Sequence, residues 1–277
     1  MLMLPRLPWS ASVGKMLSIT KAGGSVISTV SGILKKVDYW QFRAPTGVGV
    51  FLIPYLSLFT RKPGWFKYAG NWSQQSPPPG YRWQRLWLSH MQSRNVTING
   101  RWPGQPFHCL SFENPCLTEA DRAEGWKVMS QKSYRLPLKA CFVGRVEEEK
   151  GVGRLIRALA ETTTLNTISE VNIIGTGKDE KRFRQLAKQL KVPVHFLGAL
   201  PRKEVFKVYR ECHFIVLPTT ASEGFPKVLA EAANFGCIPK TSTVASIPQY
   251  IRDGKEGFLW DYETESVNAW FKKTNER

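Results

Sequence analysis

Charged side chains follow two apolar runs in the second half of the chain. Arg145 and Lys150 come after the run that ends at Gly144. Two cations at such a place can bind a diphosphate, Arg as a bidentate donor and Lys as a point charge. Glu223 and Glu231 are eight positions apart around the start of an expected helix, and their carboxylates can accept hydrogen bonds from sugar hydroxyl groups. Taken alone, the first pair is better explained as a solvated charged loop, and the second as two surface carboxylates of an ordinary exposed helix.

Glycine-containing turns lie between and beside these charged residues. Gly175–Thr176–Gly177 follows an apolar run and precedes an expected helix, which would let backbone approach a ligand at the helix N-terminus. This turn lacks the third glycine of a dinucleotide fingerprint, and alone it is better explained as an ordinary tight turn. Gly224–Phe225–Pro226 opens the helix that carries Glu231, and the free N–H groups at such a start can bind an anion.

The elements that would position these residues alternate regularly between strand and helix. The expected strands are Lys139–Gly144, Glu170–Gly175, Val194–Gly198, His213–Pro218, Gly236–Thr241 and Gly257–Trp260. The expected helices are Val152–Glu161, Lys178–Lys191, Lys203–Glu211, Phe225–Phe235 and Val244–Ile251. This alternation, with nearly continuous apolar strands, predicts a doubly wound α/β domain built on a parallel sheet. Ligands of such sheets bind beyond the carboxyl ends of the strands, which is where the charged residues above fall.

The first half predicts a second, less regular domain. Its expected elements are a helix at Ser25–Lys36, a strand at Val37–Arg43, a helix at Gly47–Leu58, strands at Trp65–Ala69 and Ser111–Pro115, and a proline-rich loop at Gln74–Arg82. A polar stretch near Gln131–Pro137 separates this part from the regular alternation. We therefore expect two domains, residues 1–134 and 135–277.

Charge is distributed unevenly between these two parts. Lys and Arg exceed Asp and Glu by 17 over 277 residues, and residues 1–136 hold 17 basic and 5 acidic side chains together with eight of the ten Trp. A basic, Trp-rich half indicates an anionic partner, which could be nucleic acid, a phospholipid surface or a phosphorylated ligand. Because no known nucleic-acid motif occurs, we do not expect nucleic acid as the partner.

The cysteines and the apolar segments bear on the compartment. None of the five cysteines forms a CxxC pair, and Cys141 and Cys212 lie in apolar runs, so we expect reduced core thiols and no zinc site. The longest apolar segment, Val48–Phe59, is too short to span a bilayer and contains Pro54. These observations predict a cytoplasmic protein, and the basic first half leaves peripheral contact with the inner face of an anionic membrane open.

The motifs together resemble glycosyltransferase family 4, the retaining "group 1" enzymes with two facing Rossmann-like domains of the GT-B type. Residues from about Leu138 to Trp260 resemble the nucleotide-sugar-binding domain of that family. The motifs occur in the family order as Gly144–Arg145, Lys150–Gly151, Gly175–Thr176–Gly177, Phe196–Leu197–Gly198 and Glu223 with Glu231. The first half is similar to the acceptor-side domain of bacterial polysaccharide glycosyltransferases through VDYWQFRAPTGVGVFLIP, KYAGNW and FENPCLT, in a shortened form.

The resemblance implies a role for each site residue. Arg145 and Lys150 would bind the donor diphosphate and stabilise the leaving nucleotide, which requires neither a metal nor another cofactor. Glu223 would act with them by holding the sugar hydroxyls, beside Gly224–Phe225–Pro226, and Glu231 would accept hydrogen bonds from the ribose. The loops with Gly144, with Gly175 and Gly177, and with Leu197 and Gly198 would frame the nucleotide.

The activity implied is transfer of a hexosyl group from a nucleotide diphosphate sugar to a glycan or a lipid-linked acceptor in polysaccharide biosynthesis, with retention of configuration. Many members carry a His after the strand that KYAGNW matches, whereas this chain has Gly70–Asn71 there, so we assign no catalytic histidine. The alternative is a catalytically silent relative that binds a nucleotide or a glycan.

Overall fold

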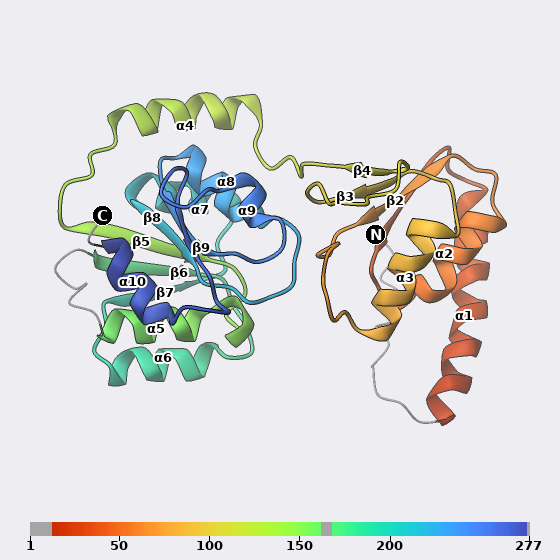
Figure 1. The fold of residues 1–277 in the computed structure, drawn as a ribbon, viewed down its shortest axis with the longest axis horizontal. Coiled ribbons are helices and arrows are strands. Elements are labelled where there is room, and N and C mark those ends of the chain that lie inside the picture. Colours follow the sequence, from red (N-terminus) through yellow and green to blue (C-terminus); the bar gives the residue numbers. More distant parts are fainter. Residues whose placement is uncertain (1–12, 162–167, 276–277) are drawn as a thin grey trace. The chain divides into compact units, whose positions relative to one another are not determined.

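Two parallel sheets, each with its own helices and its own hydrophobic core, make up the fold (Figure 1). The computed structural model describes residues 13–161 and 168–275. The chain divides between Glu113 and Asn114 into two compact units. Parallel strands joined by helical crossovers give each unit the α/β architecture that the sequence predicts.

The second unit contains the larger sheet. Its strands are β5 (Leu138–Val143), β6 (Ile168–Ile174), β7 (Val194–Gly198), β8 (Phe214–Leu217), β9 (Ile238–Ser242) and β10 (Phe258–Trp260). In the described residues they pair in the order β10–β9–β8–β5–β6–β7, all parallel, which is the strand order of a Rossmann-type fold. The central strand β8 is buried along its length, as a sheet covered on both faces requires.

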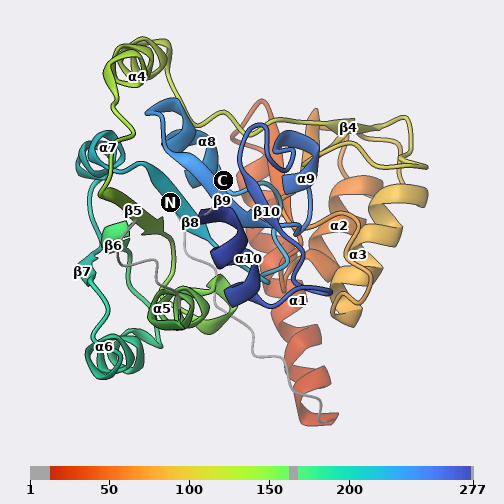
Figure 2. The same ribbon diagram turned by 60° about the vertical axis from the view of Figure 1, so that its left-hand side comes forward.

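Helices cover both faces of this sheet. They are α4 (Glu119–Gln131), α5 (Val152–Glu161), α6 (Glu180–Gln189), α7 (Arg202–Glu211), α8 (Lys227–Asn234), α9 (Ile247–Tyr250) and α10 (Val267–Asn275), with a short 3₁₀ turn η1 at Glu148–Lys150. Figures 1 and 2 show α5, α6 and α10 on one face and α4, α7 and α8 on the other. The strands and helices predicted between residues 139 and 260 each overlap an element of this unit.

Helix α4 belongs to the second unit, so the units divide before this helix and not at the predicted position 134/135. The helix begins with a capping box in which Thr118 and Asp121 bond each other's backbone N–H groups. It packs on α8, where Asn234 Nδ2 donates a hydrogen bond to Asp121 O at 2.8 Å. Residues 119–131 therefore belong with the second sheet, although the sequence analysis placed them in the first domain.

The first unit is a four-stranded parallel sheet with helices packed against one another. Its strands, β1 (Trp40–Ala44), β2 (Gly64–Tyr68), β3 (Val96–Ile98) and β4 (Cys109–Ser111), follow one another across the sheet, and its helices are α1 (Val13–Leu34), α2 (Gly49–Leu58) and α3 (Pro79–His90). Buried Gln84 of α3 bonds both backbone groups of Thr46, with Nε2 donating to O at 2.8 Å and Oε1 accepting from N at 3.1 Å. A buried amide satisfied in this way fixes α3 to the turn that starts α2.

Three local predictions in the first unit are corrected by the structure. The predicted loop at 74–82 gives way to α3 at Pro79, because proline fits the first turn of a helix. The predicted strand at 111–115 is β4, which ends at Ser111. Strand β3 was not predicted, because its three residues are too few to show an alternating pattern.

The apolar segment Val48–Phe59 forms α2, and Leu52, Ile53 and Leu56 of this helix are buried in the core of the first unit. Within the residues that the structure describes, no helix combines the length and the apolar character needed to cross a bilayer.

Candidate functional site

Backbone hydrogen bonds join the loops that follow β5, β6 and β7 at the carboxyl edge of the second sheet. Gly144 N donates to Ile174 O at 3.0 Å, and Gly175 N donates to Gly198 O at 2.7 Å. The predicted site residues Gly144, Gly175 and Gly198 therefore lie in neighbouring loops. Leu197, which precedes Gly198, has an exposed side chain. This part of the predicted site is one continuous surface of the unit.

The glycines at 175 and 177 permit this close contact between loops. Gly175 has a φ of +129°, and a Cβ atom there would lie 1.9 Å from Gly144 O. A Cβ atom at Gly177 would lie 2.3 Å from Val146 O. The packing of the β5 loop against the β6 loop thus explains both glycines, and their contact with a ligand stays a prediction.

Lys150 and Glu223 form an ion pair at this edge, although 73 positions separate them in the sequence. Lys150 lies at the end of η1, and its side chain is 10% exposed; Glu223 lies between β8 and α8 and is 38% exposed. Such a partner stabilises a nearly buried ammonium group, because burial removes its hydration. Two of the three residues predicted as catalytic are therefore in contact.

Arg154 holds the two segments of this ion pair together. Its Nε donates to Pro218 O at 2.9 Å, in the loop after β8, and its Nη2 donates to Glu149 O at 3.0 Å, in η1. Thr220 N also donates to Glu149 O at 2.9 Å. Burial lowers the pKa of Arg154. The sequence analysis did not single out Arg154 or Thr220, because neither belongs to a spaced motif.

Arg145, the third predicted catalytic residue, lies outside this pair. Its side chain is 64% exposed and pairs with Glu147, with Arg145 Nη1 and Glu147 Oε2 2.8 Å apart. Among the described residues, no ion pair or hydrogen bond joins it to Lys150 or Glu223. The printed contacts with Glu147 use only Nη1 of this guanidinium, and the predicted contact of Arg145 with a diphosphate stays a prediction.

The start of α8 lies next to Glu223 in the chain and presents backbone donors. Pro226 is the N-cap residue, and no side chain caps the helix. The first N–H groups of a helix without a cap carry partial positive charge and can bind an anion. Gly224 is buried, and the ring of Phe225 packs on that of Tyr250, with 4.8 Å between their centroids. These contacts fix the predicted Gly224–Phe225–Pro226 turn.

Glu231 forms a separate cluster on α8. Arg202 Nε of α7 lies 3.6 Å from Glu231 Oε1, and the Nη2 of the same arginine lies 3.1 Å from Asp121 Oδ2. Burial raises the pKa of Glu231, and Arg202 offsets part of that effect. Arg202 was missed from sequence, where nothing in its surroundings marks it. A ribose bound by Glu231 would have to compete with this arginine.

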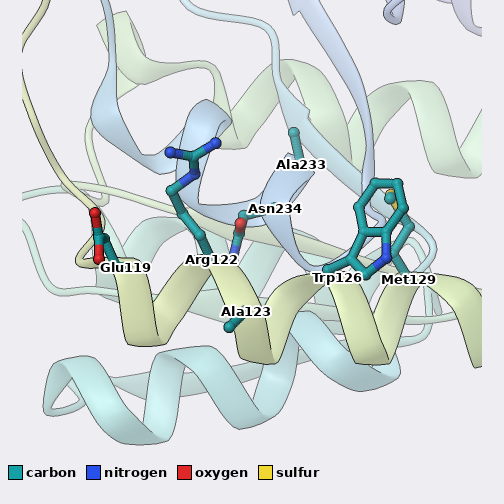
Figure 3. Close-up of a pocket in the computed structure, with 7 residues that line it drawn as sticks. All are labelled: Glu119, Arg122, Ala123, Trp126, Met129, Ala233 and Asn234. Carbon is teal, nitrogen blue, oxygen red and sulfur yellow. The ribbon is translucent and has the colours of Figure 1, made fainter.

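The described residues also form two surface pockets whose linings omit Lys150 and Glu223. One, of about 490 Å³, lies between α4 and α8, and Figure 3 shows Arg122 and Trp126 projecting from α4 in the same direction. The other, of about 660 Å³, lies along α6 and β7 and includes Leu197. Lys150 and Glu223 thus line neither of these two pockets.

Comparison with known protein families identifies the family to which the second unit is similar. Residues 130–275 match the family described as glycosyl transferases group 1. The chain belongs to this family. WcaL of Salmonella typhimurium, whose name assigns it to colanic acid biosynthesis as a glycosyltransferase, is 32% identical over 138 residues, which are 47% of this chain and 34% of WcaL. The amylovoran biosynthesis glycosyltransferase AmsK of Erwinia amylovora is 28% identical over 143 residues, 49% of this chain and 35% of AmsK.

The match thus spans about a third of the length of these group 1 relatives. Solved structures resemble more of the chain. HepE of Anabaena, in complex with UDP and glucose, has a TM-score of 0.65 at 18% identity and covers 97% of this chain and 74% of its own. A glycosyltransferase from Rickettsia africae has a TM-score of 0.63 at 12% identity, and the match covers 97% of this chain and 73% of that protein. At these identities the likeness concerns the fold, and it confirms the predicted fold class, α/β with Rossmann-like domains of the GT-B type.

Proposed function

We propose that this group 1 chain acts as a retaining glycosyltransferase of family 4. It would move a hexosyl group from a nucleotide diphosphate sugar to a glycan or a lipid-linked acceptor in polysaccharide biosynthesis, in the cytoplasm. The names of WcaL and AmsK support this reaction class. The observation that carries the proposal is the Lys150–Glu223 ion pair at the carboxyl edge, next to the uncapped start of α8.

In this proposal Lys150 binds the donor diphosphate and stabilises the leaving nucleotide. Its ammonium group is nearly buried and already held by Glu223, so little reorganisation is needed when charge develops on the leaving group. The N–H groups at the start of α8 add partial positive charge. Glu223, the more exposed partner, stays paired with Lys150 through Oε1 and accepts hydrogen bonds from the sugar hydroxyls with its other carboxylate oxygen. Fixed cations and backbone dipoles do this without a metal or another cofactor.

The remaining predicted residues complete the donor site. Arg145 binds the diphosphate as a second cation, and Glu231 accepts hydrogen bonds from the ribose in place of Arg202. The loops at Gly144, Gly175–Gly177 and Leu197–Gly198 frame the nucleotide. The acceptor attacks on the face of the leaving group, as the resemblance implies for retaining members, so no protein nucleophile is required.

Titration calorimetry of the full chain with UDP, GDP, ADP and dTDP tests the donor site. We expect one of these nucleotides to bind, and Lys150→Ala to weaken its binding at least tenfold, because a charge-assisted hydrogen bond contributes about 1.5–3 kcal/mol. Lys181→Ala, which removes an exposed cation of α6, should leave binding unchanged. If no nucleotide binds, or if Lys150→Ala binds as the parent does, the proposed site is wrong.

The second candidate function is that of a catalytically silent relative, which binds a nucleotide or a glycan without transferring a sugar. One observation favours it. Asn71, which stands where many members carry a His, accepts hydrogen bonds from Ser73 N and Ser73 Oγ at 3.1 Å each. Its side chain therefore shapes its own loop. Binding of a nucleotide sugar without release of the nucleoside diphosphate, across a panel of glycan and lipid-linked acceptors, would select this alternative. If the parent releases the nucleoside diphosphate, and Glu223→Gln loses this release while it still binds the nucleotide, the transferase is supported.

A further inference from the structure

The amino edge of the first unit's sheet is formed by three turns. In a parallel sheet the crossover helices run against the strands, so α1, α2 and α3 end at the edge where β1, β2 and β3 begin. Lys62 O accepts hydrogen bonds from both other turns, from Trp40 Nε1 at 3.0 Å and from Arg94 Nη1 at 3.1 Å. The guanidinium of Arg94 also lies over the Trp40 ring, 5.4 Å from its centroid. The three turns thus form one connected surface.

Large apolar side chains project from each of these turns into solvent. Tyr39, between α1 and β1, is 70% exposed, and Phe59, directly after α2, is 75% exposed. Leu58, the last residue of α2, and Met91, directly after α3, are also exposed. These side chains lie next to residues of the connected turns while Trp40 itself is buried. Exposed apolar groups gathered at one edge indicate an apolar binding partner.

The same turns carry a cluster of positive charge. Lys35 and Lys36 precede Tyr39, and Arg61 and Lys62 follow Phe59, so two of the three turns join two consecutive cations to a projecting aromatic ring. Between residues 13 and 113 the sequence holds twelve Lys and Arg and only two acidic residues, of which Asp38 alone lies in these turns. Among the described residues, no ion pair neutralises Lys35, Lys36 or Arg61.

We propose that this amino edge binds the surface of a lipid bilayer that contains anionic lipids. The four cations would contact headgroup phosphates, while the four apolar side chains enter the boundary between headgroups and acyl chains. Leu58 and Met91 have no flat π face for stacking on bases, which favours lipid over nucleic acid. The edge lies opposite the carboxyl edge of the same sheet, where ligands of parallel sheets bind. The inference is independent of the proposed transfer reaction.

Vesicle flotation with the full chain tests the electrostatic part. We expect binding to phosphatidylcholine vesicles with 30% phosphatidylglycerol, weakened by salt, and little binding to pure phosphatidylcholine. Replacing Lys35, Lys36, Arg61 and Lys62 by Gln should weaken binding at least tenfold. The matched control replaces Lys181, Lys188, Lys191 and Lys203, four exposed cations of the second unit, by Gln. Its net charge is the same, and it should bind as the parent does.

A single apolar substitution tests the insertion independently of charge. Phe59→Ser should weaken binding several-fold, whereas Trp126→Ser, at a similarly exposed ring on α4 of the second unit, should not. The proposal is wrong if the parent does not bind anionic vesicles, if the two charge variants weaken binding equally, or if Phe59→Ser and Trp126→Ser have the same effect. It is also overturned if the edge cations are needed for binding a single-stranded oligonucleotide and not for binding vesicles. Circular dichroism of each variant confirms that it is folded.

Discussion

Lys240 is a fully buried lysine in strand β9, surrounded by aromatic rings from three other elements. Its ammonium group lies 4.7 Å from the ring centroid of Phe214, 5.4 Å from that of Phe258 and 5.1 Å from that of Phe271. Burial lowers the pKa of Lys240 from 10.5 to about 7. The charge of this residue in the folded chain therefore changes near neutral pH, although lysine in water stays charged.

A pH-dependent stability follows from this burial. Between pH 7 and 10.5 the unfolded chain binds a proton at Lys240 that the folded chain does not, so the free energy of unfolding of the second unit rises with pH in this range. Relative to Lys240→Met, the parent should gain about 2 kcal/mol between pH 7 and pH 9. Urea unfolding at both pH values measures the difference. Lys203→Met, at an exposed lysine, should show no such trend, and a constant difference for Lys240→Met would contradict the prediction.

Residues of the candidate site were predictable from sequence where they belong to spaced motifs. Lys150 and Glu223 were each expected beyond the carboxyl end of a strand, and the structure brings them into contact. Arg154 and Arg202 were not expected, because each acts through carbonyl or carboxylate groups that are distant in the chain. Such partners become visible only when the strands are paired.

At the scale of elements, the contact between η1 and the loop before α8 decides where Lys150 lies. Arg154 of α5 bonds both segments, to Pro218 O and to Glu149 O, and thereby keeps the 3₁₀ turn against the loop. Arg157, one turn further along α5, points to Glu148 at 3.8 Å and is half exposed. Both arginines lie on α5, but only Arg154 bonds both η1 and the loop after β8.

Arg154→Met should therefore weaken the positioning of the η1 segment that carries Lys150. We expect the dissociation constant of the bound nucleotide to rise about tenfold, because the Lys150 segment is less firmly held. The free energy of unfolding should fall by about 1–2 kcal/mol through lost hydrogen bonds. Arg157→Met is the matched control and should change neither quantity appreciably. Calorimetry and urea unfolding measure the two effects. Equal effects of both substitutions would show that Arg154 has no special positioning role.

Elements were predictable from sequence where their pattern is long enough to show its period. Helix α5 matches its expected bounds, since the apolar face of Val152–Glu161 repeats at helical spacing. The assignment of α4 to a unit was not predictable, because only tertiary contacts with α8 decide it. Sequence composition near residue 131 changes at the end of this helix, which is why the boundary was placed there.

At the scale of the whole molecule, Lys132 ties the segment after α4 to the second unit. Its Nζ donates to Tyr209 O at 2.9 Å and to Phe235 O at 2.7 Å, and it also bonds Cys212 O. These carbonyls lie near the C-terminal ends of α7 and α8, where a positive charge is favoured. Burial lowers the pKa of Lys132. A chain that begins after this residue loses these bonds together with the packing of α4.

Two fragments can therefore tell the boundary at 113/114 from one at 134/135. Residues 114–277 keep α4 and Lys132, and we expect them to unfold cooperatively. Residues 135–277 lack both, and their free energy of unfolding should be lower by about 3 kcal/mol or more, because a hydrogen-bonded charge and helix packing are lost. The fragment 114–277 with Lys132→Met should fall between them. Urea unfolding followed by circular dichroism measures the free energy of unfolding of all three. Equal stability of the two fragments would place the boundary at 134/135, because α4 would then add nothing to the second unit.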